Sequence, residues 1–189
     1  NHAAGSAAGS VALVVALLAL AQPAHAQEPL DIYLIDVEGG GATLFVSPSG
    51  ESLLIDTGNG GAAASRDAGR ILDAMRDAGV AVIDHLITTH WHGDHCGAME
   101  ELAGRVPIRQ LIDHGPTVES SAAAARFLTD VYPTLYADAE HTVVSPGARI
   151  MLAGIDITVL AAGKRVVDRP LAGAGRPNPY CAAHVPQAE

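Results

Sequence analysis

Residues 88–99, TTHWHGDHCGAM, place three histidines and one aspartate within six positions, directly after an apolar run. This feature constrains the chain more than any other, because side chains that bind the same ion must be brought together by the fold. Alternate residues of an extended segment face the same way, so His90 and His92 point to one side and Trp91 to the other. The first half of the motif therefore predicts two imidazoles that converge.

The second half of the motif supplies two further donors. Gly93 permits a sharp turn that brings Asp94 and His95 round from a different direction. Four ligands this close in sequence do not all close on one tetrahedral ion. The pattern therefore predicts two adjacent metal ions, with His90 and His92 on the first and Asp94 and His95 on the second. The alternative is a polar loop that carries surface histidines.

A pair of ions at this spacing supports hydrolytic chemistry. Two ions roughly 3.5 to 4 Å apart hold a water whose pKa falls toward about 7, and they stabilise both the attacking and the leaving oxygen. The nitrogen-rich ligand set favours zinc, although iron or manganese also accepts histidine and aspartate. We assign Asp94 as the candidate catalytic residue in addition to its role as a ligand.

The pattern His90-x-His92-x-Asp94-His95 resembles the signature of the metallo-β-lactamase fold superfamily. Asp56 in LLIDTG also matches, because that superfamily carries an aspartate on a strand ahead of the histidine motif. The resemblance implies two zinc ions and a role for Asp56 in orienting the metal loop by hydrogen bonding. Without the motif, Asp56 would read as the first residue of a turn at positions 56–58.

Within the superfamily, the chain looks most like the branch that contains the hydrolase domain of bacterial competence DNA-uptake proteins and its free-standing secreted relatives. The match covers about residues 31–115 and is much more specific for fold than for substrate. It rests on an aspartate, a hydrophobic residue and a glycine-rich turn ahead of the second strand, here Asp36, Val37, Gly39, Gly40 and Gly41.

The rest of the superfamily pattern is missing from this sequence. The pattern requires a later bridging aspartate and a further histidine near the C-terminus, and no segment after residue 115 offers both. Asp156, His141 and His184 match only by residue type. The resemblance implies an αββα sandwich of two similar halves, so we expect only the N-terminal half and part of the second, in a truncated chain.

Hydrophobic periodicity predicts an α/β architecture, because strands alternate with helices over residues 51–115. Glycine and proline turns mark the boundaries between elements. The tail from residue 164 is rich in glycine, proline and alanine and is expected to be loop. The expected strands are 31–37, 42–48, 51–58, 85–90, a strand ending at 115 and several within 141–162; the expected helices are 65–78, 96–104 and 120–137, the last interrupted near Pro133.

Three segments are expected along the chain: a signal peptide, 1–26, that is incomplete at its N-terminus, a partial hydrolase domain, 27–163, and the tail, 164–189. The signal rests on the apolar stretch VALVVALLALA at 11–21, which ends near the cleavage pattern Ala24-His25-Ala26. It is too short to span a bilayer. We therefore expect an exported protein, periplasmic or secreted, with no membrane span after signal removal.

The net charge of −10 argues against a sequence-independent binder of nucleic acid, whose affinity depends on Lys and Arg. The expected partner is a small molecule or a phosphodiester substrate. A disulfide between Cys96 and Cys181 is one expectation for an oxidising compartment, and a packing role for Cys96 beside the site is the other.

His114 ends the apolar strand RQLIDHG, and ligand sites in α/β sheets lie at the carboxyl ends of strands. It either lines the pocket or caps a strand at the surface. The leading functional hypothesis is an exported di-zinc hydrolase of a phosphodiester, ester or amide. The alternatives are a noncatalytic metal-binding or partner-binding module and an inactive fragment that lacks the later metal ligands.

Overall fold

A mixed six-stranded sheet forms the centre of the computed structural model, which describes residues 29–118 and 120–175. The strand order is β1-β2-β3-β4-β5-β6. The first three strands form an antiparallel meander, and β3 to β6 run parallel. The bounds are β1 (Asp31–Leu34), β2 (Thr43–Val46), β3 (Ser52–Ile55), β4 (Ile83–Ile87), β5 (Ile108–Asp113) and β6 (Glu140–Val143).

A row of leucines crosses the middle of the sheet and forms the centre of the main core. The strand register pairs Leu44 with Leu54, Leu54 with Leu86 and Leu86 with Leu111. All four side chains are buried in one cluster with the apolar faces of the helices. The row fixes the register of the strands, because a slip by one residue would turn each leucine to the opposite face.

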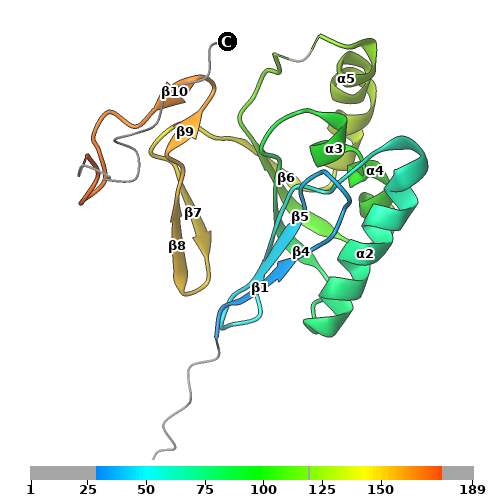
Figure 1. The fold of residues 1–189 in the computed structure, drawn as a ribbon, viewed down its shortest axis with the longest axis horizontal. Helices are drawn as coiled ribbons and strands as arrows, with labels where there is room; N and C mark the ends of the chain where they lie inside the picture. The colour runs from blue at the N-terminus through cyan, green and yellow to red at the C-terminus, as the bar shows by residue number, and fades with distance from the viewer. Residues whose placement is uncertain (1–28, 119, 176–189) are drawn as a thin grey trace, which may run out of the picture.

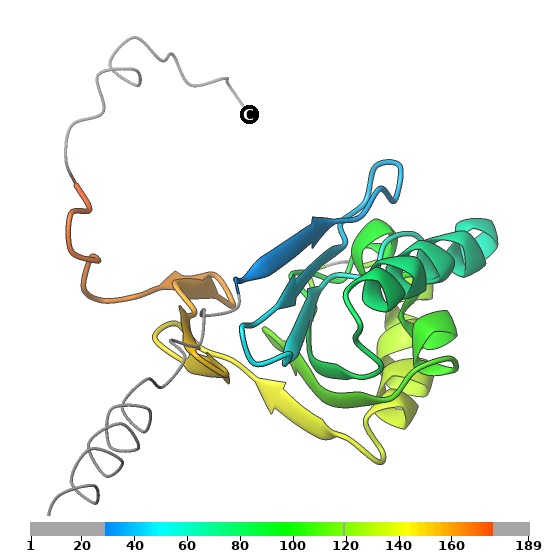
Figure 2. The same ribbon diagram turned by 90° about the horizontal axis from the view of Figure 1, so that it is seen from below.

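The helices all cover one face of this sheet, as both ribbon views show (Figures 1 and 2). Because each parallel crossover needs a connecting segment on the face of the sheet, the chain places a helical segment after β3, β4 and β5. The α/β architecture expected from the sequence is therefore confirmed. The helical segments are η1 (Gly61–Ala63), α2 (Ala64–Asp77), α3 (Gly93–Cys96), α4 (Met99–Ala103), α5 (Ala122–Arg126), η2 (Phe127–Val131) and α6 (Tyr132–Leu135).

Two of the predicted helices differ from the structure in detail. The helix expected at 96–104 begins at Gly93 and is divided into α3 and α4, because the Gly97 amide donates to the Gly58 carbonyl across the loop. The helix expected at 120–137 is divided into α5, one π turn, η2, and α6, and Pro133 lies in the first turn of α6. Proline has no amide hydrogen and crowds the preceding turn, which accounts for the wider turn at this point.

The opposite face of the sheet is covered by a hairpin of β7 (Arg149–Leu152) and β8 (Ile155–Thr158). On β7, the side chains of Ile150 and Leu152 are buried, while the side chain of Met151 between them is exposed. Figure 2 shows the order of layers plainly: helices, sheet, then this hairpin.

A second hairpin, β9 (Ala161–Ala162) and β10 (Arg165–Val166), follows β8. The sequence prediction of a loop from residue 164 onward was therefore wrong for the first residues of the tail. The reason is the two-residue turn Gly163-Lys164, in which both residues adopt positive φ, 55° and 61°. That is the turn that joins tightly paired antiparallel strands.

The predicted signal segment 1–26, Cys181 and His184 lie outside the described residues. A membrane-spanning helix needs about 20 apolar residues; in the ranges that the structure describes, no helix has that length and hydropathy.

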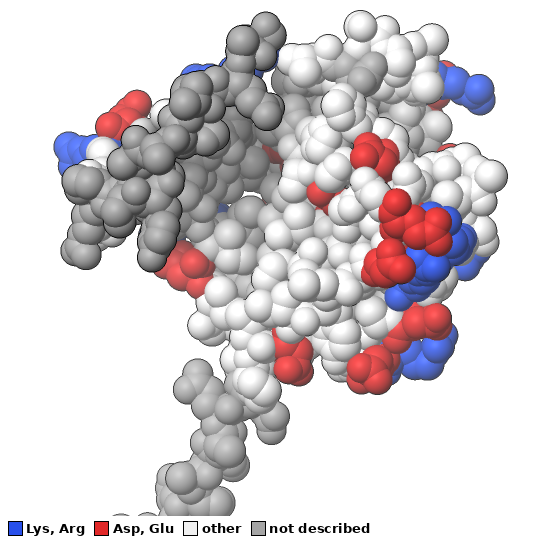
Figure 3. Space-filling model, viewed as in Figure 1, with Lys and Arg blue, Asp and Glu red and all other residues white. Residues whose placement is uncertain are grey.

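The outer surface of α2 carries charges of both signs, and Figure 3 shows acidic and basic side chains intermixed over that helix. The buried exception is Asp67 in the first turn of α2, which accepts hydrogen bonds from the Asn59 amide at 2.8 Å and from Arg66 Nε at 2.7 Å. Burial opposes ionisation of this carboxyl. The hydrogen bonds from Arg66 and Asn59 outweigh burial and lower the pKa of Asp67 below its ordinary value.

Asp67→Asn is expected to destabilise the fold by about 1 to 3 kcal/mol at pH 7, because a buried charged acceptor is lost. A lowered folded pKa contributes stability that is present above the unfolded value of about 3.9 and is lost as the pH falls through the folded value. The difference between wild type and variant should therefore shrink below pH 4, as measured by urea unfolding.

Asp73→Asn is the matched control. Asp73 lies on the same helix but pairs with Arg76 at the surface, where its side chain is 70% exposed. Its replacement should change the free energy of unfolding by less than about 1 kcal/mol. Equal losses for both variants would contradict the role given to Asp67.

Candidate metal centre

The predicted site residues lie at the carboxyl ends of three neighbouring parallel strands. Asp56 follows β3, His90 follows β4 by a short connection, and His114 follows β5. Because β3, β4 and β5 are parallel neighbours, these ends meet at the same edge of the sheet. The topology alone therefore brings together residues that are far apart in the sequence.

Short helix α3, which carries Asp94 and His95, is held in place by backbone hydrogen bonds on several sides. Its carbonyls accept from amides of the β1–β2 connection and of the segment after β3. The bonds run from Gly60 to Gly93 at 3.0 Å, from Gly41 to Asp94 at 3.1 Å and from Thr57 to His95 at 2.7 Å. The position of this helix is fixed by main-chain contacts and so does not depend on the rotamers of neighbouring side chains.

The glycines of the β1–β2 connection are required by this close approach. A Cβ on Gly40 would lie 1.9 Å from the carbonyl oxygen of Asp94. A Cβ on Gly41 would lie 3.0 Å from His95 Nδ1 and 3.1 Å from the Asp56 carboxylate. The glycine-rich turn is therefore one wall of the site and more than a connection between strands.

Asp56 is a buried acceptor at the centre of the site. Its Oδ1 accepts from the Thr89 amide at 2.8 Å. Its Oδ2 accepts from Thr89 Oγ1 at 2.6 Å and pairs with His95 Nδ1 at 2.8 Å. The residue adopts a left-handed φ of 61°, an uncommon conformation for a non-glycine residue but one that Asp and Asn tolerate best.

These contacts determine which nitrogens of two histidines are available. The Asp56 carboxylate only accepts, so His95 Nδ1 donates to it and Nε2 keeps its lone pair. Thr89 Oγ1 donates its proton to Asp56 and therefore accepts from His90 Nδ1, 3.1 Å away. His90 Nε2 is left as an acceptor in the same way. One carboxylate thus sets the tautomer of both rings.

The remaining donor atoms form two pairs. His90 Nε2 accepts a hydrogen bond from His92 Nδ1 at 3.1 Å, and His95 Nε2 and Asp94 Oδ2 lie 3.8 Å apart. Two ligands of one tetrahedral zinc, each about 2.0 to 2.2 Å from the ion, are separated by roughly 3.3 to 3.5 Å. The separations in this structure, 3.1 and 3.8 Å, lie on either side of that range, so the two pairs approach the spacing of zinc ligands without matching it. The rings of His90 and His95 approach to 4.0 Å between centroids, which places the two pairs side by side.

Neither pair is completed to a group of three. Among residues 29–118 and 120–175, no set of three or more His, Cys, Asp or Glu side chains is arranged to hold a metal ion. The structure thus brings together the four motif residues as two pairs, and within the described ranges it does not add a third ligand to either.

Burial, with His95 and His92 as neighbours, lowers the pKa of His90 below its ordinary value. A neutral imidazole is the form that binds a metal ion, so this environment favours the binding-competent state.

The expected sharp turn at Gly93 is not a left-handed one. Gly93 begins α3, after an extended His92 with φ −73° and ψ 146°. The first turn of α3 brings Asp94 and His95 round from a different direction, as predicted, and Gly93 makes this turn without a positive φ. Trp91 is buried on the side away from His92, and its Nε1 donates to the Gly115 carbonyl at 2.9 Å.

His114 lines a cavity of about 760 Å³ together with Thr89, the residue directly before the motif. Its ring lies 6.2 Å from that of Trp91.

Two other residues considered as ligands have different partners: His141 Nε2 pairs with the buried Asp113 at 2.7 Å, and Asp156 pairs with Arg149 on the β7–β8 hairpin.

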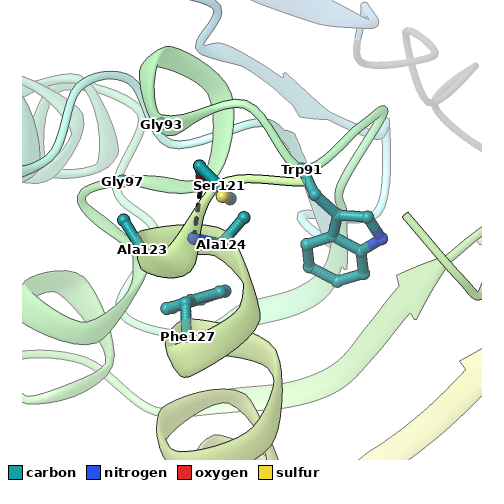
Figure 4. Close-up of a pocket in the computed structure, with 8 residues that line it drawn as sticks. Trp91, Gly93, Gly97, Ser121, Ala123, Ala124 and Phe127 are labelled. Atoms are coloured by element: carbon teal, nitrogen blue, oxygen red, sulfur yellow. Dashed lines mark hydrogen bonds between the residues drawn. The ribbon is translucent and has the colours of Figure 1, made fainter. Parts of the chain in front are cut away.

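A smaller cavity of about 330 Å³ lies behind the motif, between α3 and the start of α5 (Figure 4). Trp91 and Phe127 form its apolar walls, and the Cys96 thiol borders it. Burial raises the pKa of Cys96 to about 11, so the thiol stays protonated near neutral pH. Among the described residues Cys96 is a free cysteine in the core, which fits the packing role expected for it.

Comparisons with known proteins identify similar families and structures. The model of the Metallo-beta-lactamase superfamily matches residues 36–161. An atrochrysone carboxyl ACP thioesterase from Aspergillus terreus is 35% identical over 68 residues, which are 36% of this chain and 20% of the relative. The chain thus spans about one fifth of that relative.

Three solved metallo-beta-lactamases are similar at low identity. MEM-A1, a subclass B3 enzyme from a soil metagenome library, has 23% identity and a TM-score of 0.47, with 70% of this chain and 51% of that one covered. SMB-1 has 18% identity and a TM-score of 0.46, and the match covers 70% of this chain and 53% of that one. The HARLDQ-motif enzyme of Cronobacter sakazakii has 20% identity and a TM-score of 0.42, and the match covers 70% of this chain and 52% of that one. The chain spans about half the length of these structures.

Gly40→Ala is expected to destabilise the fold by about 3 kcal/mol or more, because the added methyl group overlaps a backbone carbonyl that cannot move independently. Thermal and urea unfolding measure this loss directly.

Gly69→Ala provides the control, since a Cβ at this position in α2 meets nothing within 4 Å. That variant should be neutral or stabilising by up to about 1 kcal/mol. A Gly40→Ala protein as stable as the wild type would show that the turn does not pack against α3 as described.

Proposed function

Because the chain belongs to the metallo-beta-lactamase superfamily, we propose that it is a metal-dependent hydrolase whose centre is the motif after β4. The observation that carries the proposal is the pair of contacts from Asp56 to His95 and, through Thr89, to His90. Those contacts leave Nε2 of each histidine without a proton, which is the form in which this nitrogen can bind a metal ion. Carboxylate partners of this kind orient ligating histidines in metal sites generally.

We assign zinc as the metal and the two donor pairs as its ligands, His90 with His92 and Asp94 with His95. Zinc at these positions supplies a Lewis acid for a carbonyl or phosphoryl oxygen and lowers the pKa of a water.

The residues of this site have separate roles in the proposed hydrolysis. Asp94 is the candidate catalytic carboxylate, because its side chain is 43% exposed beside His95 and can accept a proton from water. Asp56 and Thr89 are positioning residues, since they lie beneath the histidines and set their tautomers. The glycine turn and α3 fix the separation of the donor atoms.

The proposed substrate is a small acyl ester or thioester. The similarity to a thioesterase over 68 residues supports this class. A small phosphodiester is the second candidate, supported by the resemblance of the segment around Asp36 and Gly39–Gly41 to competence-type hydrolase domains. The net charge of −10 argues against a long polyanion. We also propose export, on the basis of the apolar stretch at 11–21.

A noncatalytic metal-binding or partner-binding module of the same fold is the alternative function. It is favoured by one observation, namely that within the described ranges each donor pair lacks a third ligand. The first experiment below separates the two functions.

Elemental analysis of the purified chain after zinc loading and dialysis should give about two zinc ions per chain. His92→Ala should remove the first ion and abolish hydrolysis of p-nitrophenyl acetate, S-acetyl thioesters and bis(p-nitrophenyl) phosphate. His85→Gln is the control, because His85 lies on β4 and pairs with Gln110 at 2.7 Å outside the motif. Zinc without hydrolysis would favour the noncatalytic metal-binding module, and absence of zinc would contradict both the hydrolase and that module and would favour a partner-binding module.

Asp56→Asn tests the positioning role. Asparagine tolerates the left-handed backbone as aspartate does, so the substitution isolates the loss of the charged acceptor. Zinc affinity should fall by about 10- to 100-fold while the fold is retained. Competition with a chromogenic chelator gives the affinity, and circular dichroism reports the fold. An unchanged affinity would show that Asp56 does not orient the ligands.

A further inference from the structure

The cavity beside His114 is formed by three segments that are separate in the sequence. Thr89 supplies the wall nearest the motif, the loop 114–118 supplies the second wall, and the β9–β10 hairpin supplies the third. The hairpin lies against the loop, since a Cβ on Gly163 would be 3.8 Å from the His114 carbonyl oxygen. With a volume of about 760 Å³, the cavity has room for a small organic molecule.

The charged side chains that line this cavity are basic. Lys164 and Arg165 lie on the hairpin wall, and among the described lining residues no aspartate or glutamate opposes them. This is unusual for a chain with a net charge of −10, in which acidic residues outnumber basic ones 21 to 11. A local positive wall in an acidic protein attracts anions to this cavity in preference to the rest of the surface.

Arg165 is partly held in place, because its guanidinium donates to Ser145 Oγ at 3.3 Å. Lys164 lies in the left-handed turn of the hairpin and is exposed. Both side chains thus keep donors available for a ligand, and the hydrogen bond to Ser145 restrains Arg165.

The other lining side chains are largely apolar. Val118 on the loop and Val166 on the hairpin are 76% and 70% exposed, and Pro116 and Ala161 add to the same walls. Large exposed aliphatic side chains on facing walls of a cavity gain stability when a ligand removes them from water. The cavity therefore has an apolar body and a cationic end.

We propose that this cavity binds the acyl part of an amphipathic anionic substrate, with its carboxylate on Lys164 and Arg165 and its apolar chain between the loop 114–118 and the hairpin. Thr89, which contacts His90 at 3.1 Å, places the far end of the ligand beside the motif. The inference rests on the proposed function for its biological role, since it names the substrate class of that site. Ligand binding itself does not require the metal.

The test uses the full chain in EDTA, with octanoate as the anionic probe and octanamide as its neutral counterpart, followed by isothermal titration calorimetry. Trp91, the single tryptophan, lies 6.2 Å from His114 and gives an independent fluorescence signal. Octanoate should bind, and octanamide should bind about tenfold more weakly, because the neutral amide forms no ion pair with Lys164 or Arg165.

The double variant Lys164→Asn with Arg165→Gln should weaken octanoate binding by about tenfold and leave octanamide binding unchanged. Asparagine is chosen because it tolerates the left-handed turn. Arg76→Gln is the control for loss of a positive charge elsewhere, since Arg76 is an exposed residue of α2. Equal affinity for the two probes, or a double variant that binds octanoate like the wild type, would overturn the inference.

Failure of this inference is distinguishable from failure of the proposed function. With zinc present, the chain is assayed on p-nitrophenyl hexanoate and on the p-nitrophenyl monoester of adipic acid, which carries a free carboxylate. Octanoate binding without any hydrolysis would leave the anion site intact and contradict the hydrolase. Hydrolysis of both esters at equal kcat/KM, with no octanoate binding, would support the hydrolase and contradict the anion site.

Discussion

The buried carboxylate of Asp56 links the end of β3 to the histidine motif that follows β4. It accepts from the Thr89 amide, the Thr89 hydroxyl and His95. Through these bonds one side chain fixes the path of the chain as it leaves β4 and the protonation of two imidazoles. The uncommon left-handed backbone at Asp56 costs free energy, and the surrounding hydrogen bonds offset that cost. Local strain of this kind persists only where the fold determines the conformation.

The sheet supplies the framework on which this interaction depends. The leucine row from Leu44 to Leu111 fixes the register of β2 to β5, and that register places Asp56 level with the residues that follow β4. Membership of the metallo-beta-lactamase superfamily accounts for the combination of motif, preceding aspartate and α/β sheet. The basic cavity beside His114 is built from segments that lie outside the motif, so its chemistry is separable from that of the centre.

Sequence reasoning predicted the strands and helices well where hydrophobic periodicity was strong, as in β2 to β5 and α2. It missed strand β10, because the turn before it has only two residues, Gly163 and Lys164, and the two short strands on either side show no clear hydrophobic alternation. The role of Thr89 was missed, since a threonine beside a strand is common and only the tertiary contact with Asp56 distinguishes it. His141 carried no sequence signal for its partner, because its pairing with Asp113 arises from the parallel addition of β6 to β5.

The packing of Gly40 and Gly41 against α3 has a consequence for how this protein can change during evolution. Because α3 is held by main-chain hydrogen bonds, the backbone position of Asp94 and His95 does not depend on the side chains of the surrounding loops. The loop after β5 and the β9–β10 hairpin can therefore exchange residues while the backbone that carries the four motif residues stays unchanged. A fixed backbone at the motif, with variable loops around it, would allow the same fold to accommodate chemically distinct ligands.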